Sequence, residues 1–439
     1  MTTRQFRYSA SVFGLMLVGW KSLASQIERM TDTSNLHTHW QQRMSYQRPH
    51  AQLHRRPFAL TFFTYLRENS DMPVAAYAFL ISFALPALIA LAAIYGGPFL
   101  AGVPIYAWGV TSFLDGILGQ NNDNPDPQTP EQDIFWHRVI TIVWAPIQVI
   151  SIIGCLYAAS LGHLPLNQQV WLFMGLGVAT GSIGINYAHE LIHQRAKIEK
   201  WAGEWLLSSV FYGHFTTEHL YNHHLYVATP KDPVTARYNE GFWRFLPRAV
   251  IGTATSAWEI DADRQRRRGL GVLSLSNPWW THLIISFGFL SIAWAMLGWW
   301  GAALYLIMCA VAIVQLEAVN YVEHYGLTRE HLGGGKYEHT KPHHSWNATQ
   351  AATNLFLINL QRHSDHHYKP DRRYPLLQTY SEDDAPKLPF GYPLMVLFAL
   401  TPPLWFRVMN RRVKAWRKRH YPHIKDWSLY KAGLNPLPR

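Results

Sequence analysis

The chain has 439 residues, of which 49% are hydrophobic and only 15% are charged, and it carries 19 Trp, 22 Tyr and 21 Phe. This composition indicates a membrane protein and argues against a set of soluble domains. The two cysteines, Cys155 and Cys309, lie in apolar runs, which excludes a disulfide framework and a Cys-x-x-Cys metal site. The net charge of +11 fits a polar part that faces an anionic leaflet or an acidic protein, and without a nucleic-acid motif no nucleic-acid partner is expected.

Residues 1–70 are predicted to form a polar, partly disordered extension. Within them, Ser11 to Trp20 is a short apolar run that follows Arg4 and Arg7 and resembles a signal peptide. A cleaved signal would place the new N-terminus outside the cell, against the orientation predicted below. A targeting role is therefore kept as the alternative.

Six membrane-spanning helices are predicted from hydropathy, all within a membrane domain at 71–415, and each is near the length that crosses a bilayer: about 74–96, 98–117, 137–159, 168–188, 281–299 and 301–322. Three short turns, which contain no Lys or Arg, join these spans in pairs: 96–98, 162–165 and 298–301. The predicted fold class is therefore an all-α integral membrane protein, in which six transmembrane helices adjoin a helical cytoplasmic part.

Basic residues fill the N-terminal stretch, residues 194–276 and the segment after residue 328. The positive-inside rule then places both termini in the cytoplasm, and predicts a multi-pass protein of the inner membrane with cytoplasmic segments 189–276 and 323–415. A basic tail, 416–439, follows. The stretch from Pro402 to His420 mixes Trp with Arg and Lys, which predicts a helix at the headgroup surface. Docking of an acidic partner is the alternative, there and at Arg264 to Arg268.

Nine histidines gather in four short clusters at the cytoplasmic ends of the spans: His189 and His193; His219, His223 and His224; His324; and His363, His366 and His367. Imidazoles spaced i, i+4 or i, i+3, i+4 share one face of a helix and can converge on a metal ion. Because all four clusters fall in one compartment, they predict a metal site that holds more than one ion.

The first cluster, His189-Glu190-x-x-His193, also matches the zinc-protease signature. A zinc site needs only one or two further ligands, so seven additional histidines would be surplus. A metal transporter is a second alternative, but its histidines would line a path across the bilayer instead of one side.

A set dominated by neutral imidazole suits Fe(II) and leaves the ions positive and able to take electrons and bind O₂. Side chains beside the clusters are candidates to orient the rings and balance the charge from a second layer: Glu190, His214, Glu218, Glu323, His344 and Asp365. For each cluster the alternative is a structural role, which would bury many polar rings and cost stability unless each found a partner.

The order and text of the clusters resemble the integral-membrane alkane 1-monooxygenase family, which is related to xylene monooxygenases and membrane fatty-acid desaturases. The resemblance covers about residues 74–415. Its most specific strings run from Asn320 to Gly326 and from Leu360 to His367, and Ala228 to Pro233 supports them. Two departures, Asn222 for a usual Gly and Tyr368 for a usual small residue, spare the ligands but bear on the shape of the pocket.

The resemblance implies that the nine histidines bind two irons, without saying how they divide between them. It also implies the reaction: O₂ delivers one oxygen atom to the terminal C–H bond of medium- to long-chain n-alkanes, which gives 1-alkanols. Ala107 and Trp108 in the second span are candidate walls of the substrate channel, although ordinary helix packing is the usual role of such a Trp. A xylene-type methyl hydroxylase and a fatty-acid desaturase or hydroxylase are the alternatives.

Each turnover needs two electrons, yet the sequence holds no Rossmann or flavin fingerprint and no cysteine cluster. An external carrier is therefore expected on the cytoplasmic side. The resemblance suggests rubredoxin or ferredoxin, with an NAD(P)H-dependent reductase, while the alkane would arrive through the membrane lipid.

Overall fold

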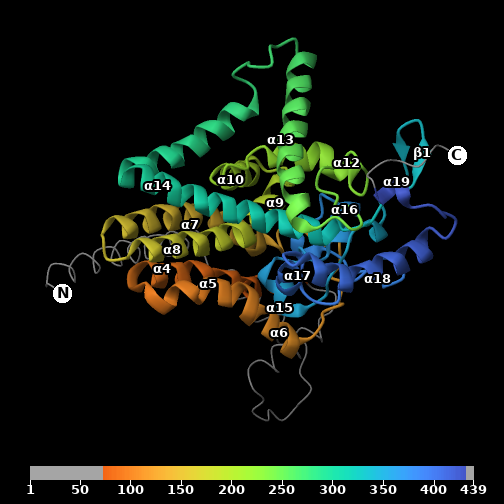
Figure 1. Ribbon diagram of the computed structural model, residues 1–439, viewed down its shortest axis with the longest axis horizontal. Helices are drawn as coiled ribbons and strands as arrows, with labels where there is room; N and C mark the ends of the chain where they lie inside the picture. The colour runs from red at the N-terminus through yellow and green to blue at the C-terminus, as the bar shows by residue number, and fades with distance from the viewer. Residues whose placement is uncertain (1–72, 432–439) are drawn as a thin grey trace. The chain divides into compact units, whose positions relative to one another are not determined.

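The computed structural model describes residues 73–431 (Figure 1), which fall in one compact unit of the chain. The predicted extension at 1–70, with the signal-like run, lies outside the described residues, and so does the end of the predicted tail at 416–439. The described residues are mostly helical, with almost no strand. Their two strands, β1 (His331–Gly333) and β2 (Lys336–Tyr337), form an antiparallel ribbon in which His331 faces Tyr337.

Within residues 73–431, five helical stretches are long and apolar enough to cross a membrane: Ala76–Tyr95 (η1 and α4), Gly97–Leu118 (η2 to α6), Phe135–Ser160 (α7), Leu166–Ile192 (α8, η4 and α9) and Pro278–His324 (α14). The 47 residues of α14 would extend about 70 Å if straight, more than twice the hydrocarbon thickness. Gly298 breaks this helix with a φ of 63°, and its two halves run in different directions from the break (Figure 1). With α14 as two spans, the predicted set of six and the all-α membrane fold are confirmed.

Two glycines bring the fourth span against the second half of α14. A Cβ on Gly177 would lie 2.7 Å from the carbonyl oxygen of Met308, and a Cβ on Gly181 would lie 2.7 Å from the Cβ of Gln315. Small residues at such contacts let two helix backbones approach closely within a membrane. Because both helices end in histidines, this contact sets the distance between His189 and His324.

Three π-helical segments interrupt the α-helices near these histidines: η3 (Ile105–Val110), η4 (Thr180–Ile185) and η5 (His219–His223). A π-turn widens the helix and rotates the side chains that follow it, and such turns are common at functional sites. The segment η4 leads directly into α9 (Asn186–Ile192), which carries His189.

The remaining elements surround the inner ends of the spans. They are short helices that present histidines and longer ones that pack around them: α10 (Lys197–Ser208), α11 (Phe215–Glu218), α12 (His224–Tyr226), α13 (Phe242–Arg267), η6 (Pro342–His344), α15 (Ala351–Phe356), α16 (His363–Tyr368), η7 (Tyr374–Leu376), α17 (Tyr392–Ala399), α18 (Pro402–His420) and α19 (Ser428–Lys431). The axes of α17 and α18 meet at 118°, so the arginine-rich α18 leaves the direction of α17 sharply.

A cluster of ion pairs ties the loop after α16 to this frame. The carboxylate of Glu199 in α10 is fully buried and accepts from two arginines, at 3.1 Å from Nε of Arg138 in α7 and 2.9 Å from Nη1 of Arg373. Both arginines also reach Glu131, at 3.1 Å and 2.7 Å. One buried carboxylate therefore connects α7, α10 and the segment that follows the last histidine cluster.

Candidate metal centre

The nine predicted histidines meet in two separate groups. Five form the first group, His189, His193, His219, His224 and His366, and four form the second, His223, His324, His363 and His367. Within each group every candidate ligand atom lies within 4.8 Å of the others. The groups are neighbours, because the rings of His224 and His367 are 4.7 Å apart between centroids.

The ring nitrogens of the first group point at a common centre. Nε2 of His224 lies 3.0 Å from Nε2 of His219 and 3.1 Å from Nε2 of His366. Nε2 of His193 is also 3.0 Å from that of His219. Nitrogens bound at right angles to one ion, at about 2.1 Å each, would be about 3.0 Å apart. The spacing therefore fits a metal ion in contact with all of them.

The second group has the same geometry and adds a carboxylate. Nε2 of His363 lies 3.0 Å from that of His367 and 3.2 Å from that of His324, and His223 approaches His367 to 3.2 Å. An oxygen of Glu323 is 3.2 Å from Nε2 of His363. Glu323, predicted to act from a second layer, thus lies directly beside one ring nitrogen of this group.

The second cluster is divided between the groups by its π-helix. In an α-helix His219 and His223, four residues apart, would share a face. In η5 they do not: His219 and His224, five residues apart, join the first group, and His223 joins the second. The last cluster splits in an α-helix, where His363 and His367 share a face and His366 points to the other group.

With the exception of His223, the rings outside the membrane helices are held neutral. Burial and, to a smaller extent, the neighbouring ring of His223 together lower the pKa of His193 to about 3. For the same two reasons the pKa lies well below its usual range in His219, His224, His363, His366 and His367. A neutral ring keeps the lone pair that a metal needs, so these side chains are ready to bind a cation.

His223 differs from the other rings because it contacts a buried carboxylate. Its Nδ1 lies 3.0 Å from Oδ2 of Asp232, which also accepts from the hydroxyl of Thr235 at 2.6 Å. Burial alone would lower the pKa of His223, but the charge of Asp232 outweighs it and raises that pKa. Such a carboxylate fixes the tautomer, so that Nε2 faces the metal. Sequence reasoning assigned Asp232 no role, although the Ala228 to Pro233 string contains it.

Two other predicted carboxylates bond near the histidines without contacting a ring nitrogen. Glu190 accepts from Nε2 of Gln194 at 2.8 Å, and Glu218 accepts from Nδ2 of Asn222 at 3.1 Å. Burial raises the pKa of Glu218 to about 8, with the nearby charge of Asp232 adding to the effect. Asn222, the departure from the usual Gly, thus orients this carboxyl group.

Asp365 lies between two histidines of α16 but is turned away from both groups. Its oxygens accept from Nη1 of Arg372 at 2.6 and 2.7 Å, and from the hydroxyl of Tyr380 at 2.6 Å. The backbone N–H of Gln378 donates to it at 2.9 Å. These bonds fold the chain after α16 back onto the helix that carries three of the nine histidines.

His214 lies among aromatic rings. It stacks on Trp279 with 5.7 Å between ring centroids, and its ring is 4.6 Å from that of Tyr212. Among the described residues no ring contact joins His214 to the nine histidines. Its predicted role near the metals would therefore act through the packing of Tyr212, whose hydroxyl donates to Glu317 at 2.7 Å.

His344 belongs to a separate clasp between η6 and the end of α18. The backbone N–H of Lys341 donates to Nδ1 of His344 at 2.9 Å, so a neutral ring carries its proton on Nε2 and donates to the hydroxyl of Tyr421 at 2.8 Å. That hydroxyl in turn donates to Glu338. His343 completes, with Glu338 and His344, a third set of potential metal ligands among the described residues. Since the hydrogen bonds already use their ligand atoms, we assign the set a structural role.

We expect this clasp to loosen in acid. Burial lowers the pKa of His343 to about 3 and that of His344 to about 4, against about 6.5 in an unfolded chain. As pH falls below 6.5, the unclasped state takes up protons that the clasped state excludes, so stability is lost. Burial alone would raise the pKa of Glu338, but hydrogen bonds from His344 and other groups lower that pKa overall. The stability that the ionised Glu338 contributes is therefore lost only at a more acid pH. Protection of the α18 amides against hydrogen exchange, corrected for intrinsic rates, should fall between pH 7 and 5. Protection that does not change with pH would contradict the assignment. In the variant His344→Gln, the dependence of protection on pH should disappear.

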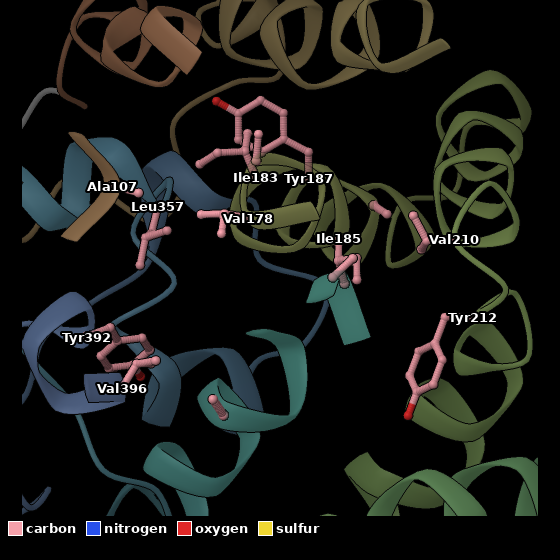
Figure 2. Close-up of a cluster of buried hydrophobic side chains, with 14 of the residues drawn as sticks. Ala107, Val178, Ile183, Ile185, Tyr187, Val210, Tyr212, Leu357, Tyr392 and Val396 are labelled. Atoms are coloured by element: carbon pink, nitrogen blue, oxygen red, sulfur yellow. The ribbon is translucent and has the colours of Figure 1, made fainter. Parts of the chain in front are cut away.

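An apolar pocket ends at both groups. Its cavity volume is about 60 Å³, and it is lined mainly by residues of η3, η4, α14, α15 and α17. Ala107 and Trp108 line it, as do His189, His219, Glu323 and His363. Figure 2 shows Ala107 beside Leu357 and Tyr392 beside Val396, all of which line this pocket. The structure thus brings the two predicted channel residues into one cavity with histidines of both groups.

Comparison with known proteins gives consistent matches over most of the chain. Alkane 1-monooxygenase 2 of Pseudomonas aeruginosa is 40% identical over 316 residues, which cover 70% of this chain and 82% of the relative. Alkane 1-monooxygenase of Acinetobacter baylyi is 36% identical over 345 residues, or 78% of this chain and 81% of the relative. The xylene/toluene monooxygenase hydroxylase component of Pseudomonas putida is more distant, at 27% over 61% of this chain and 68% of its own.

The fatty acid desaturase family model matches residues 165–399. That range begins just before α8 and ends with α17, so it contains all nine histidines and the helices that hold them. The predicted resemblance is confirmed over most of the chain. By these matches the chain belongs to the alkane 1-monooxygenase family and is an oxidoreductase.

Proposed function

We propose that this protein hydroxylates the terminal carbon of medium- to long-chain n-alkanes with O₂, at two iron ions held by the nine histidines. The observation that carries the proposal is an apolar pocket that ends at two adjacent groups of converging imidazoles. The relatives named alkane 1-monooxygenases support the substrate class.

The overall reaction is R–CH₃ + O₂ + 2 e⁻ + 2 H⁺ → R–CH₂OH + H₂O. One ion would be held by the five-histidine group, and the other by the four-histidine group together with Glu323. When bound, the iron pair supplies the reduction of O₂ and the oxidising power that attacks a C–H bond. Asp232 would fix the tautomer and orientation of His223 by accepting from its Nδ1.

The chain's own side chains select the carbon that reacts. The pocket walls are largely apolar, and Trp108, Ala107 and Val396 line it together with histidines of both groups. An alkane that enters lengthwise presents only its terminal methyl to the metal groups, so proximity and orientation favour the chain end. The same apolar lining keeps water away from the reacting carbon.

Electrons come from an external one-electron carrier. Both cysteines are buried in membrane helices, so neither could serve as an exposed redox group. We propose rubredoxin or ferredoxin, reduced by an NAD(P)H-dependent reductase, as the donor. The positive-inside orientation places the carrier, both termini and the metal groups in the cytoplasm, at the inner membrane.

A series of n-alkanes of graded length tests the proposal. We expect the purified protein to hold two irons per chain and to form primary alcohols carrying oxygen from isotopically labelled O₂, when rubredoxin, its reductase and NADH are present. Without the carrier, turnover should stop. A single zinc per chain, secondary alcohols or new double bonds as the main product would each contradict it, and the last would favour desaturation.

A further inference from the structure

Three large side chains are exposed directly beside the metal groups. Tyr221 is 44% exposed, Leu225 is 57% exposed and Tyr368 is 48% exposed. Tyr221 and Leu225 flank His224 in sequence, while Tyr368 follows His367. The two segments adjoin, because the rings of His224 and His366 are 4.8 Å apart between centroids. All three residues lie outside the membrane-spanning helices, so the lipid core does not account for their exposure.

Cations lie beside two of these side chains, and a third cation follows the first histidine cluster in sequence. The guanidinium of Arg264 lies 4.6 Å from the ring centre of Tyr221, and Nζ of Lys369 lies 5.1 Å from that of Tyr368. Arg195, two residues after His193, has a side chain that is 94% exposed. Two carboxylates are close: buried Asp261, which pairs with Arg264 at 3.3 Å, and Asp371, which is 4.0 Å from Arg195.

We call this surface, formed by Tyr221, Leu225, Tyr368, Arg195, Arg264 and Lys369, the docking face. Two of the nine histidines, His193 and His224, are only partly buried, and both belong to the five-histidine group under this face. The four rings of the other group are all buried. An electron that arrives here therefore enters at the five-histidine group, and the contact between His224 and His367 leads on to the second group.

We propose that the docking face receives the one-electron carrier, an acidic redox protein, and that electrons enter through His193 and His224. This inference rests on the proposed function. The exposed apolar centre provides the area that is desolvated on binding, and the cationic rim matches an acidic partner and steers its approach. Each encounter oxidises one carrier by one electron, so two encounters supply the two electrons that each alkane and O₂ require.

The test reverses charge at the rim. In the double variant Arg195→Glu, Lys369→Glu, we expect the KM for reduced rubredoxin to rise by about tenfold or more, with kcat at saturating carrier nearly unchanged. Rates with wild-type protein should fall as salt increases, and the double variant should show a weaker dependence. A matched control, Arg411→Glu with Lys414→Glu, makes the same charge change on exposed positions of α18 and should leave the KM near its wild-type value.

Single turnovers separate this proposal from the proposed function. Protein reduced by dithionite needs no carrier, so both double variants should then form as much alcohol as the wild type. If the wild type itself forms none, the proposed function fails. If it forms alcohol but the rim variant keeps a normal KM, or if the α18 pair raises the KM instead, the docking face is wrong. If the rim variant has the same KM as the wild type but no longer binds vesicles, the docking face would be assigned to a lipid surface.

Discussion

His367→Ala is expected to abolish alkane hydroxylation, by at least about a hundredfold, and to lower the iron content from two ions per chain toward one. In the second group Nε2 of His367 lies 3.0 Å from that of His363 and 3.2 Å from that of His223, so its removal opens one side of the site. Changes to second-layer partners alone typically cost 10–100-fold in metal affinity or activity, and loss of a direct ligand should cost more. The measurements are iron per chain and alcohol formed in a single turnover.

A surface histidine supplies the matched control. His339 is exposed and belongs to neither group, so His339→Ala changes the same residue type away from the candidate metal ligands. It should keep two irons and full activity. Full activity in His367→Ala at normal expression would show that the four-histidine group holds no ion that the reaction uses.

Much of this architecture follows from local patterns. The six spans are visible as apolar runs of sufficient length, and the turn at Gly298 is visible as a glycine with a flanking Gly301 between two of them. The histidines were found because spacings of three and four residues put side chains on one helix face. Each of these features depends on residues close together in sequence.

The division of the histidines depends on geometry that no local spacing shows. His219 and His223 look like a pair on one face, yet the π-turn of η5 sends them to different groups. Asp232 and Asp365 show the same limit. Both are carboxylates near a histidine cluster, but the loop after η5 turns Asp232 onto His223, while Arg372 and Tyr380 hold Asp365 away. Tertiary contacts therefore determine which of these carboxylates contacts a histidine ring.

Glu199→Ala is expected to lower the free energy of unfolding by about 3–5 kcal/mol, because it leaves two buried or half-buried arginines without their shared carboxylate. Arg373 places one guanidinium between Glu199 and Glu131, and Arg138 bridges the same pair. Arg373 also precedes Tyr374, whose hydroxyl donates to the carbonyl of His137 at 3.2 Å. The loss of stability should therefore extend to α16 through the loop that follows this helix. The measurement is unfolding in detergent, followed by heat or denaturant.

Glu259→Ala on the exposed side of α13 is the matched control, since removal of an exposed carboxylate usually changes stability by less than about 0.5 kcal/mol. If Glu199→Ala unfolds like this control, the buried ion pairs do not stabilise the fold.

A further comparison separates the stability of the fold from the binding of iron. Glu199 bonds to Arg138 and Arg373 and to none of the nine histidines in the described part of the chain. Folded Glu199→Ala protein at low temperature should therefore keep both irons, whereas His367→Ala should lose iron while retaining its stability toward heat in the metal-free form. Loss of stability in Glu199→Ala, together with loss of iron in His367→Ala, would show that the ion-pair cluster supports the fold and that the imidazoles hold the metal.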